Sequence, residues 1–311
     1  MKTTLSLLGV LLLVTVSWLY RNSKTDYFHS GVVKYQKGDM DDALMDFTKA
    51  ISINSNDVAA YSNRGNVRLT KGDMNDALAD YTKAISLNPD LPEAYNNRGL
   101  VKYSNGDPDG ALNDFSKSIA LKLDYADAYN NRGDVKQAKH DFDEALTDYS
   151  KAISLKPDYV LAYNNRGNTK QAKGDTGGAL ADFTKAIELK PDYAPAYSNR
   201  GNLKDSTGDL DGALADLNRA VELKPDDAAI FYNRGHVKHD KADLNGALAD
   251  YTKAIELNPN FVYAYDNRGN VSVAKGDFIS AQTDFTKVLE LEPNNVETRK
   301  KLIEIKSRIT K

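Results

Sequence analysis

Glycines recur at one fixed interval along this chain. They stand at Gly31, Gly65, Gly99, Gly133, Gly167, Gly201, Gly235 and Gly269, always 34 residues apart. A period of this length is the signature of a solenoid, in which each small unit buries its apolar face only against its neighbours. We therefore expect the 311 residues to form an extended repeat array rather than ordinary globular domains.

Counting Lys24 as position 1 divides the chain into a leading segment, eight units and a tail. The leading segment is 1–23 and the tail is 296–311. The units are 24–57, 58–91, 92–125, 126–159, 160–193, 194–227, 228–261 and 262–295.

Each unit reads as two helices joined by a turn. In the second unit, the first helix is expected to run to about Thr70 and the second from about Asn75 to Leu87. Gly72 supplies the turn, and Pro89 helps to end the second helix. Alanine at position 20 lets the two helices approach closely, and an aromatic residue at position 24 fills the space between them.

Several positions agree together across most units: an aromatic at 4, Gly at 8, Gly at 15, Ala at 20, an aromatic at 24, Ala at 27 and Pro at 32. In this combination the chain resembles the tetratricopeptide repeat family over about 272 of its 311 residues. The departures are local. Ser55 and Leu123 replace the terminal proline, His140 and Ala242 replace the turn glycine, and arginine stands at position 7, where the family usually has leucine.

The resemblance implies an all-α fold, a right-handed α-solenoid or superhelix of eight helix-turn-helix repeats. It also implies that the first helices build a concave face, and that this groove binds extended peptides. The amphipathic tail 296–311 looks like the capping helix that such an array needs at an open end.

Asparagine fills position 6 of every unit after the first, where His29 stands instead. Asparagine is only a middling helix former, so helix propensity does not explain its repetition in the middle of the first helix. The family resemblance implies that positions 2, 5, 6, 9, 12 and 13 face the groove, where a carboxamide can donate to and accept from a bound peptide unit. We call the position-6 residues the asparagine ladder: Asn63, Asn97, Asn131, Asn165, Asn199, Asn233 and Asn267; Asn168 and Asn202 join the expected peptide-binding set from position 9.

The spacing of the asparagine ladder suits an extended ligand. Adjacent helices pack ~8–10 Å apart and an extended chain rises ~3.3 Å per residue, so one asparagine would meet about every third ligand residue. Such contacts would hold backbone without reading sequence. In the alternative, the asparagines bond only to neighbouring helices and set the superhelical pitch. Positions 9 and 12 lack repeated lysine or arginine, so a clamp for acidic chain ends is not expected.

Arginine at position 7 and aspartate at position 23 recur together. In an antiparallel helix pair folded about position 16 they lie nearly level, so pairing within a unit or with the adjoining unit is reasonable. The sequence predicts partly buried, bidentate ion pairs that mainly fix register, because desolvation offsets much of the attraction. The alternative presents the arginines to an anionic ligand. The residues are Arg64, Arg98, Arg132, Arg166, Arg200, Arg234 and Arg268, with Asp80, Asp114, Asp148, Asp182, Asp216, Asp250 and Asp284.

Composition and motifs exclude several function classes. Acids and bases are interleaved and the formal net charge is only -3, so no basic field draws the chain to nucleic acid. The absence of cysteine excludes disulfides, thiolate metal sites and a thiol nucleophile. No nucleotide-binding loop, nucleophile elbow or zinc-protease motif occurs, so we expect no catalytic residue, no cofactor and no enzyme activity.

His236 and His239 have the i, i+3 spacing of a helical metal pair. Asp205 stands one unit earlier at the same position as His239, and the pattern is compatible with a weak transition-metal site in the groove. The sequence does not specify a third ligand. We therefore expect polar groove residues here and no metal.

The stretch from Thr3 to Tyr20 carries no charge. It is slightly long for a signal-peptide core of about 7–15 residues and at the short end of the roughly 17–25 that span a bilayer. Trp18 and Tyr20 suit a membrane interface, which favours an uncleaved anchor over a cleaved signal peptide within 1–23. Either interpretation makes the protein membrane-anchored or exported, with its repeats on the extracytoplasmic side.

These features lead to one principal function and one alternative. The principal function is a non-catalytic scaffold that binds an extended peptide, or a segment of a partner protein, in the concave groove. The alternative is a structural or accessory subunit of a membrane or cell-envelope complex that uses the convex face or the array ends.

Overall fold

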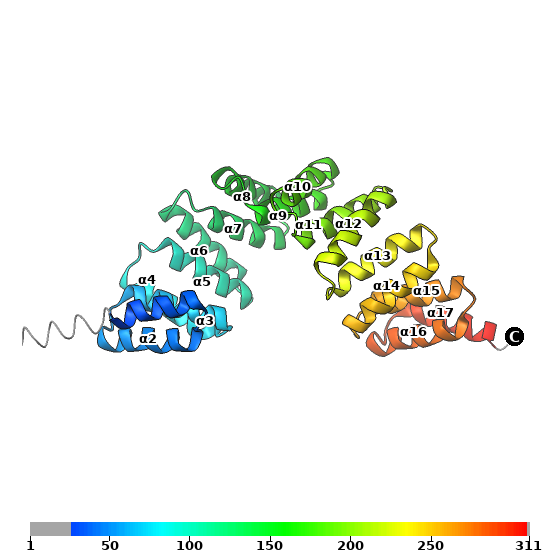
Figure 1. Cartoon of the computed structure of the whole chain (residues 1–311), viewed down its shortest axis with the longest axis horizontal. Coiled ribbons are helices and arrows are strands. Elements are labelled where there is room, and N and C mark those ends of the chain that lie inside the picture. The colour runs from blue at the N-terminus through cyan, green and yellow to red at the C-terminus, as the bar shows by residue number, and fades with distance from the viewer. Residues whose placement is uncertain (1–25, 310–311) are drawn as a thin grey trace, which may run out of the picture. The chain divides into compact units, whose positions relative to one another are not determined.

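The computed structural model describes residues 26–309, and every regular element in that range is an α-helix (Figure 1). The segment 1–23, predicted as a signal peptide or membrane anchor, lies outside the described residues. Within 26–309, no helix combines the length and the apolar content that crossing a bilayer requires.

The chain divides between Pro157 and Asp158 into two compact units. The first unit contains a helix over 26–37, then α2 (Met40–Ile53), α3 (Val58–Lys71), α4 (Met74–Leu87), α5 (Pro92–Ser104), α6 (Pro108–Leu121), α7 (Ala126–Ala138) and α8 (Phe142–Leu155). The second unit contains α9 (Val160–Ala172), α10 (Thr176–Leu189), α11 (Ala194–Ser206), α12 (Leu210–Leu223), α13 (Ala228–Asp240), α14 (Leu244–Leu257), α15 (Val262–Ala274), α16 (Phe278–Leu291) and α17 (Val296–Ile309).

Inside each compact unit, helices that follow one another along the chain also pack side by side. Each helix contacts the next one along the chain, as α3 contacts α4 and α4 contacts α5. The first helices of adjacent repeats also contact each other directly: α3 with α5 and α5 with α7, and in the second unit α9 with α11, α11 with α13 and α13 with α15. The first helices of each unit therefore form a continuous row, which the second helices flank.

Left-handed residues make the turns inside the helix pairs. Gly72 ends α3 with φ of 84°, and its N–H donates to the Leu69 carbonyl at 3.1 Å. His140 and Ala242, which replace the turn glycine, adopt the same conformation with φ of 66° and 61°. The predicted departures therefore keep the turn, at the cost of roughly 1–2 kcal/mol for each side chain that enters this region.

The position-24 side chains form the core between the paired helices. Tyr81 and its counterparts are buried, and each side chain lies against the backbone of the first helix at the position-8 glycine; the counterpart beside Gly201 is Leu217 and the others are aromatic. A Cβ added to Gly65 would stand 2.8 Å from Tyr81 Cε1, which is closer than carbon atoms approach without displacement. Glycine is therefore required here by the close approach of the ring.

The helix α17 closes the C-terminal end of the second unit. Ile305 is 3% exposed and packs with Ala281 and Phe285 of α16. Lys301 Nζ donates to both carboxylate oxygens of Asp266 on α15, at 3.0 and 2.9 Å. The predicted all-α fold of helix-turn-helix repeats followed by a capping helix is confirmed.

Candidate functional site

The asparagine ladder lies on the first helices. Its seven residues, on α3, α5, α7, α9, α11, α13 and α15, are all half-buried. Asn168 on α9 and Asn202 on α11 are also half-buried. The amides are thus neither core residues nor freely solvated surface groups.

In the first unit, ladder side chains bond across to the preceding first helix. Asn97 Nδ2 donates to Asn66 Oδ1 at 2.9 Å, and Asn131 Nδ2 donates to Asn96 Oδ1 at 3.0 Å. Asn63, the first residue of the ladder, instead donates from Nδ2 to the Ala59 carbonyl of its own helix at 2.9 Å. Two of these amides therefore tie neighbouring repeats together.

The second unit repeats this arrangement. Asn199 Nδ2 donates to Asn164 Oδ1 at 2.9 Å, and Asn267 Nδ2 donates to the Tyr232 hydroxyl at 3.1 Å. These bonds between first helices are the ones expected if the asparagines link neighbouring helices.

Sequence reasoning missed the acceptors at position 5. Asn96 and Asn164, which accept from Asn131 and Asn199, are 4% and 5% exposed, so they lie deeper than the ladder residues that follow them. The doubled asparagine in "YNNRG" is the signal that could have identified them, because a second amide is available to pair with the ladder residue of the next repeat.

A hollow of about 310 Å³ opens on the first-helix row between α3 and α5. Its lining is partly apolar and partly polar. The apolar residues are Val58, Ala59, Leu91 and Ala94, and the polar ones are Ser62, Asn63, Asn66, Tyr81, Glu93 and Asn97, of which Asn63 and Asn97 belong to the ladder. Its volume lies within the range of about 300–1,000 Å³ that is usual for ligand pockets. The hollow therefore brings two ladder residues to one concave surface.

The structure brings each position-7 arginine to the position-23 aspartate of its own helix pair. In every pair the Arg Nη2–Asp Oδ1 distance is 2.6 or 2.7 Å, and Arg Nε donates to Asp Oδ2 at 2.8–3.0 Å. This is the two-pronged geometry that a guanidinium offers a carboxylate. The pairs are Arg64–Asp80, Arg98–Asp114, Arg132–Asp148, Arg166–Asp182, Arg200–Asp216, Arg234–Asp250 and Arg268–Asp284.

A second cation meets most of the same aspartates, and sequence reasoning missed it. Position 11 carries lysine or arginine, and its nitrogen lies 2.6–2.8 Å from Asp Oδ2 in Lys34–Asp46, Arg68–Asp80, Lys102–Asp114, Lys136–Asp148, Lys170–Asp182, Lys204–Asp216 and Lys238–Asp250. The buried carboxylates are thereby neutralised from two sides.

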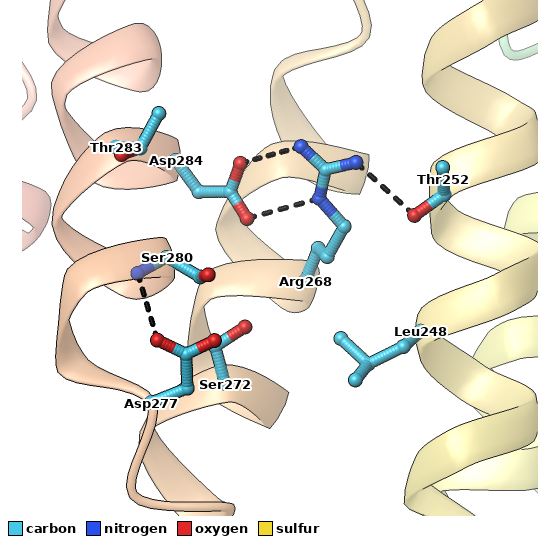
Figure 2. A pocket seen from close by; sticks show the side chains of 8 residues that line it. All are labelled: Leu248, Thr252, Arg268, Ser272, Asp277, Ser280, Thr283 and Asp284. Atoms are coloured by element: carbon cyan, nitrogen blue, oxygen red, sulfur yellow. Dashed lines mark hydrogen bonds and ion pairs between the residues drawn. The ribbon is translucent and has the colours of Figure 1, made fainter.

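The position-7 arginines also contact groups outside the ion pair. The Arg268 guanidinium lies 5.6 Å from the centre of the Tyr265 ring, and each of the other six contacts the aromatic residue three positions earlier. Figure 2 shows Arg268 on α15 between Asp284 of α16 and Thr252 of α14, whose hydroxyl accepts from Nη1 at 3.1 Å. Arg268 therefore joins two adjacent helix pairs while remaining occupied by its aspartate.

Figure 2 also shows a second hollow, of about 330 Å³, beside this ion pair. Leu248 and the hydroxyls of Ser272 and Ser280 contribute to its lining, and the Ser280 N–H donates to Asp277 Oδ1 at 3.0 Å. Its charged groups, Arg268 and Asp284, are already paired with each other. The arrangement is that of a helix junction rather than of a reactive site.

The sequence matches one family over most of its length. The match to the TPR repeat covers 31–72, 66–106, 138–174, 206–241 and 235–276, and the tetratricopeptide repeat matches 160–193 and 262–295. These segments make up more than half of the chain. No curated protein matches the chain.

Solved structures share the fold at low sequence identity. A chain of the APC/C hetero-tetramer Cut9–Hcn1 is 18% identical with a TM-score of 0.68, and the match covers 86% of this chain and 52% of that one. This chain thus spans about half the length of that relative. A tetratricopeptide repeat protein from Parabacteroides merdae is 20% identical with a TM-score of 0.64, over 80% of this chain and 99% of that chain. PilF of Pseudomonas aeruginosa is 17% identical with a TM-score of 0.62, over 68% and 97%.

The repeated helix pairs, the glycine–aromatic contacts within them and the sequence match all identify the same architecture. This chain belongs to the tetratricopeptide repeat family, whose members are typically non-catalytic scaffolds that mediate protein–protein interactions.

Proposed function

We propose that this protein is a non-catalytic scaffold that holds an extended peptide, or an extended segment of a partner protein, along its row of first helices. The observation that carries the proposal is the hollow of about 310 Å³ between α3 and α5, which is lined by Asn63, Asn66 and Asn97. An amide-lined concave surface suits a peptide backbone because each peptide unit presents one donor and one acceptor.

The lateral bonds of the ladder are compatible with ligand binding. A carboxamide carries two N–H donors and a carbonyl oxygen with two lone pairs. The bond from Asn97 to Asn66 uses one of the Asn97 donors and holds the amide in a fixed orientation. A pre-oriented group loses less side-chain entropy on binding, so the same bond that links two helices also prepares Asn97 for a ligand.

The charge distribution favours an uncharged backbone segment over an anionic ligand. The position-7 arginines are held by buried aspartates; Asp114, for example, is 5% exposed at its side chain and lies 2.7 Å from Arg98. An arginine held in this way would have to leave a desolvated carboxylate in order to meet an anion. The ligand that suits this face is therefore recognised through its main chain.

The test is a binding measurement on the full chain. Peptides are selected from a random library against the wild type, and the dissociation constant of the best peptide is measured for the double variant Asn63→Ala with Asn97→Ala. We expect binding to weaken at least tenfold, because two backbone-holding amides are lost from one hollow.

A matched control shows whether the position of the lost amides matters. Asn75 on α4 and Asn113 on α6 are exposed asparagines on second helices of the same two repeats. The double variant Asn75→Ala with Asn113→Ala makes the same chemical change away from the hollow and should bind within about twofold of the wild type. Equal affinity of both double variants for the peptide would show that the ladder only links helices.

An assembly role through the array end is the second candidate. On α17, Val296 and Ile303 are 60% and 65% exposed and lie seven residues apart, so that they share one face of the helix. If this face assembles complexes, sedimentation of the full chain should reveal species larger than the monomer, and Ile303→Asp should remove them. A monomer at every concentration, with wild type and variant alike, contradicts self-assembly through this face.

We also propose that the repeats are held at, or exported across, a membrane with the array on the extracytoplasmic side. The uncharged stretch from Thr3 to Tyr20 supports this proposal. Protease treatment of intact and of permeabilised vesicles tests it. In intact vesicles whose lumen corresponds to the extracytoplasmic side, the repeats should resist the protease, and permeabilisation should make them sensitive. Digestion of the repeats in the intact vesicles contradicts the topology.

A further inference from the structure

Three potential metal ligands converge between two first helices of the second unit. Asp205 lies in the last turn of α11, and His236 and Asp240 lie one turn apart on α13. His236 Nδ1 is 3.1 Å from Asp205 Oδ2 and 3.8 Å from Asp240 Oδ2. One ligand atom from each of the three residues lies within 4.8 Å of the others.

One carboxylate oxygen of this group is buried and without a partner. Asp205 Oδ1 is shielded from solvent, and within the described range 26–309 no hydrogen bond reaches it. A buried acceptor left unsatisfied costs about 1–3 kcal/mol, and more when it carries charge. The other oxygen of the same carboxylate, Oδ2, is the atom that faces His236. Two carboxylates beside one imidazole favour a positively charged group among them.

A fourth side chain, His239, contacts one of these three residues, Asp240. His239 Nδ1 lies 3.3 Å from Asp240 Oδ1, the carboxylate oxygen that does not face His236. Metal-binding carboxylates commonly have their second oxygen held by a hydrogen bond in this way. His239 thus positions Asp240 and is not one of the three converging residues.

We propose that Asp205, His236 and Asp240 bind a divalent transition-metal ion of the Zn²⁺ class. Metal–ligand bonds of about 2.0–2.2 Å place neighbouring ligand atoms roughly 3–3.6 Å apart. The distance from His236 to Asp205 already lies in this range, and the other separations, which are below 4.8 Å, would have to shorten by up to about 1 Å. An imidazole nitrogen selects transition metals over Mg²⁺ and Ca²⁺, which take oxygen ligands. Two carboxylates supply the negative charge that the ion neutralises.

The site is open on one side. The side chains of His236 and Asp240 are 44% and 41% exposed, whereas that of Asp205 is 18% exposed. Three protein ligands and an exposed face leave a coordination position for water or for a ligand group of a partner. The site does not depend on peptide binding at the asparagine ladder, so either proposal can fail without the other.

Sequence reasoning found part of this group. It singled out the His236–His239 pair with Asp205 and expected no metal, because no third ligand was specified. The structure supplies Asp240 as that ligand and places His239 behind it. The spacing from His236 to Asp240 is i, i+4, which would have pointed to the same helix face.

Isothermal titration calorimetry of the full chain with Zn²⁺ alone tests the proposal by measuring the number of ions bound and their affinity. We expect one ion per chain, and a loss of at least tenfold in affinity for Asp205→Asn and for His236→Gln. Asp134→Asn, which changes a carboxylate on the first helix α7, should bind within about twofold of the wild type. Absence of saturable binding, or equal affinity of all three variants, overturns the proposal.

A measurement on the wild type covers the case in which a variant does not fold. Diethyl pyrocarbonate modifies accessible imidazoles, and mass spectrometry follows each histidine separately. Zn²⁺ should slow the modification of His236 at least tenfold and leave His140, an exposed turn residue, unchanged. Equal rates for His236 with and without Zn²⁺ overturn the proposal.

Discussion

Arg166 on α9 and Asp182 on α10 form a bidentate ion pair inside one helix pair, with Nε–Oδ2 and Nη2–Oδ1 distances of 2.8 and 2.7 Å. The Asp182 side chain is only 5% exposed, and Lys170 lies 2.8 Å from its Oδ2. Hydrogen bonding to Asp182 raises the pKa of Arg166, against the opposing effect of burial. The pair joins the two helices at a fixed register.

Breaking this pair should be costly in a way that removing both partners is not. Arg166→Met leaves Asp182 with Lys170 still beside it, and Asp182→Leu leaves Arg166 and Lys170 without their shared carboxylate. Each variant should lower the free energy of unfolding by about 1–3 kcal/mol. The double variant should lose less than the sum, with a coupling energy of about 1–3 kcal/mol. Urea unfolding of the four proteins measures it.

An exposed ion pair on α10 gives the control for this double-mutant cycle. Lys185 and Glu188 on α10 are 45% and 59% exposed and lie 3.1 Å apart. Solvent screening should leave almost no coupling between them. A coupling near zero for Arg166 with Asp182 as well would contradict the register role of the buried pair.

Acid should weaken the first repeat through Asp46. Burial alone would raise the pKa of Asp46, but hydrogen bonds from Lys34 and Ser30 outweigh it and hold the pKa below its ordinary value. Such a carboxylate stabilises the fold above its unfolded pKa of about 3.9, and the contribution is lost as the pH falls through the folded pKa. When the pH is lowered from about 5 to about 2, the free energy of unfolding should therefore fall less for Asp46→Asn than for the wild type. Superimposable pH profiles from urea unfolding count against this assignment.

The contact between Gly167 and Phe183 predicts a steep size limit. A Cβ at Gly167 would lie 2.6 Å from Phe183 Cε1, so Gly167→Ala should overpack the core and destabilise the protein by about 1–3 kcal/mol. At Gly177 on α10 an added Cβ meets nothing within 4 Å. Gly177→Ala should instead stabilise by up to about 1 kcal/mol, through helix propensity alone. Thermal unfolding compares the two, and a shift of the same sign in both variants contradicts the packing argument.

The non-glycine turns offer a stabilising change. Ala242 has φ of 61°, a region where an L side chain is strained, so Ala242→Gly should stabilise by about 1 kcal/mol. Gly208, with φ of 85°, occupies the equivalent turn of the preceding helix pair, and Gly208→Ala should destabilise by a similar amount. Measured unfolding midpoints that do not move in opposite directions argue against backbone strain at these turns.

Much of the fold could be predicted because it follows from contacts that recur every 34 residues. The helix limits predicted for the second 34-residue repeat, 58–91, agree closely with α3 and α4. They could be predicted because Gly72 and Pro89 stand where these two helices end. The turns at His140 and Ala242 were less predictable. Whether a side chain enters the left-handed region there depends on how firmly the helices on both sides hold the turn, which local sequence does not state.

The contacts of the candidate site could be predicted from the sequence only in part. Arg64 and Asp80 could be placed together because antiparallel helices bring their positions to one level. The second cation, Arg68, was missed even though its i, i+4 spacing from Arg64 directs it to the same carboxylate. The bond from Asn97 to Asn66 was not predictable, because it depends on side-chain torsions and on the offset between two separate helices.

The central claim is that a bound peptide lies along the first helices, and site-specific photo-cross-linking tests it most directly. A benzophenone amino acid is placed at Tyr103 on α5 or at Asn113 on α6, two exposed positions in one helix pair. The peptide selected on the wild-type chain should cross-link from position 103 and not from position 113. Cross-linking from position 113 alone, or equally from both positions, contradicts the claim.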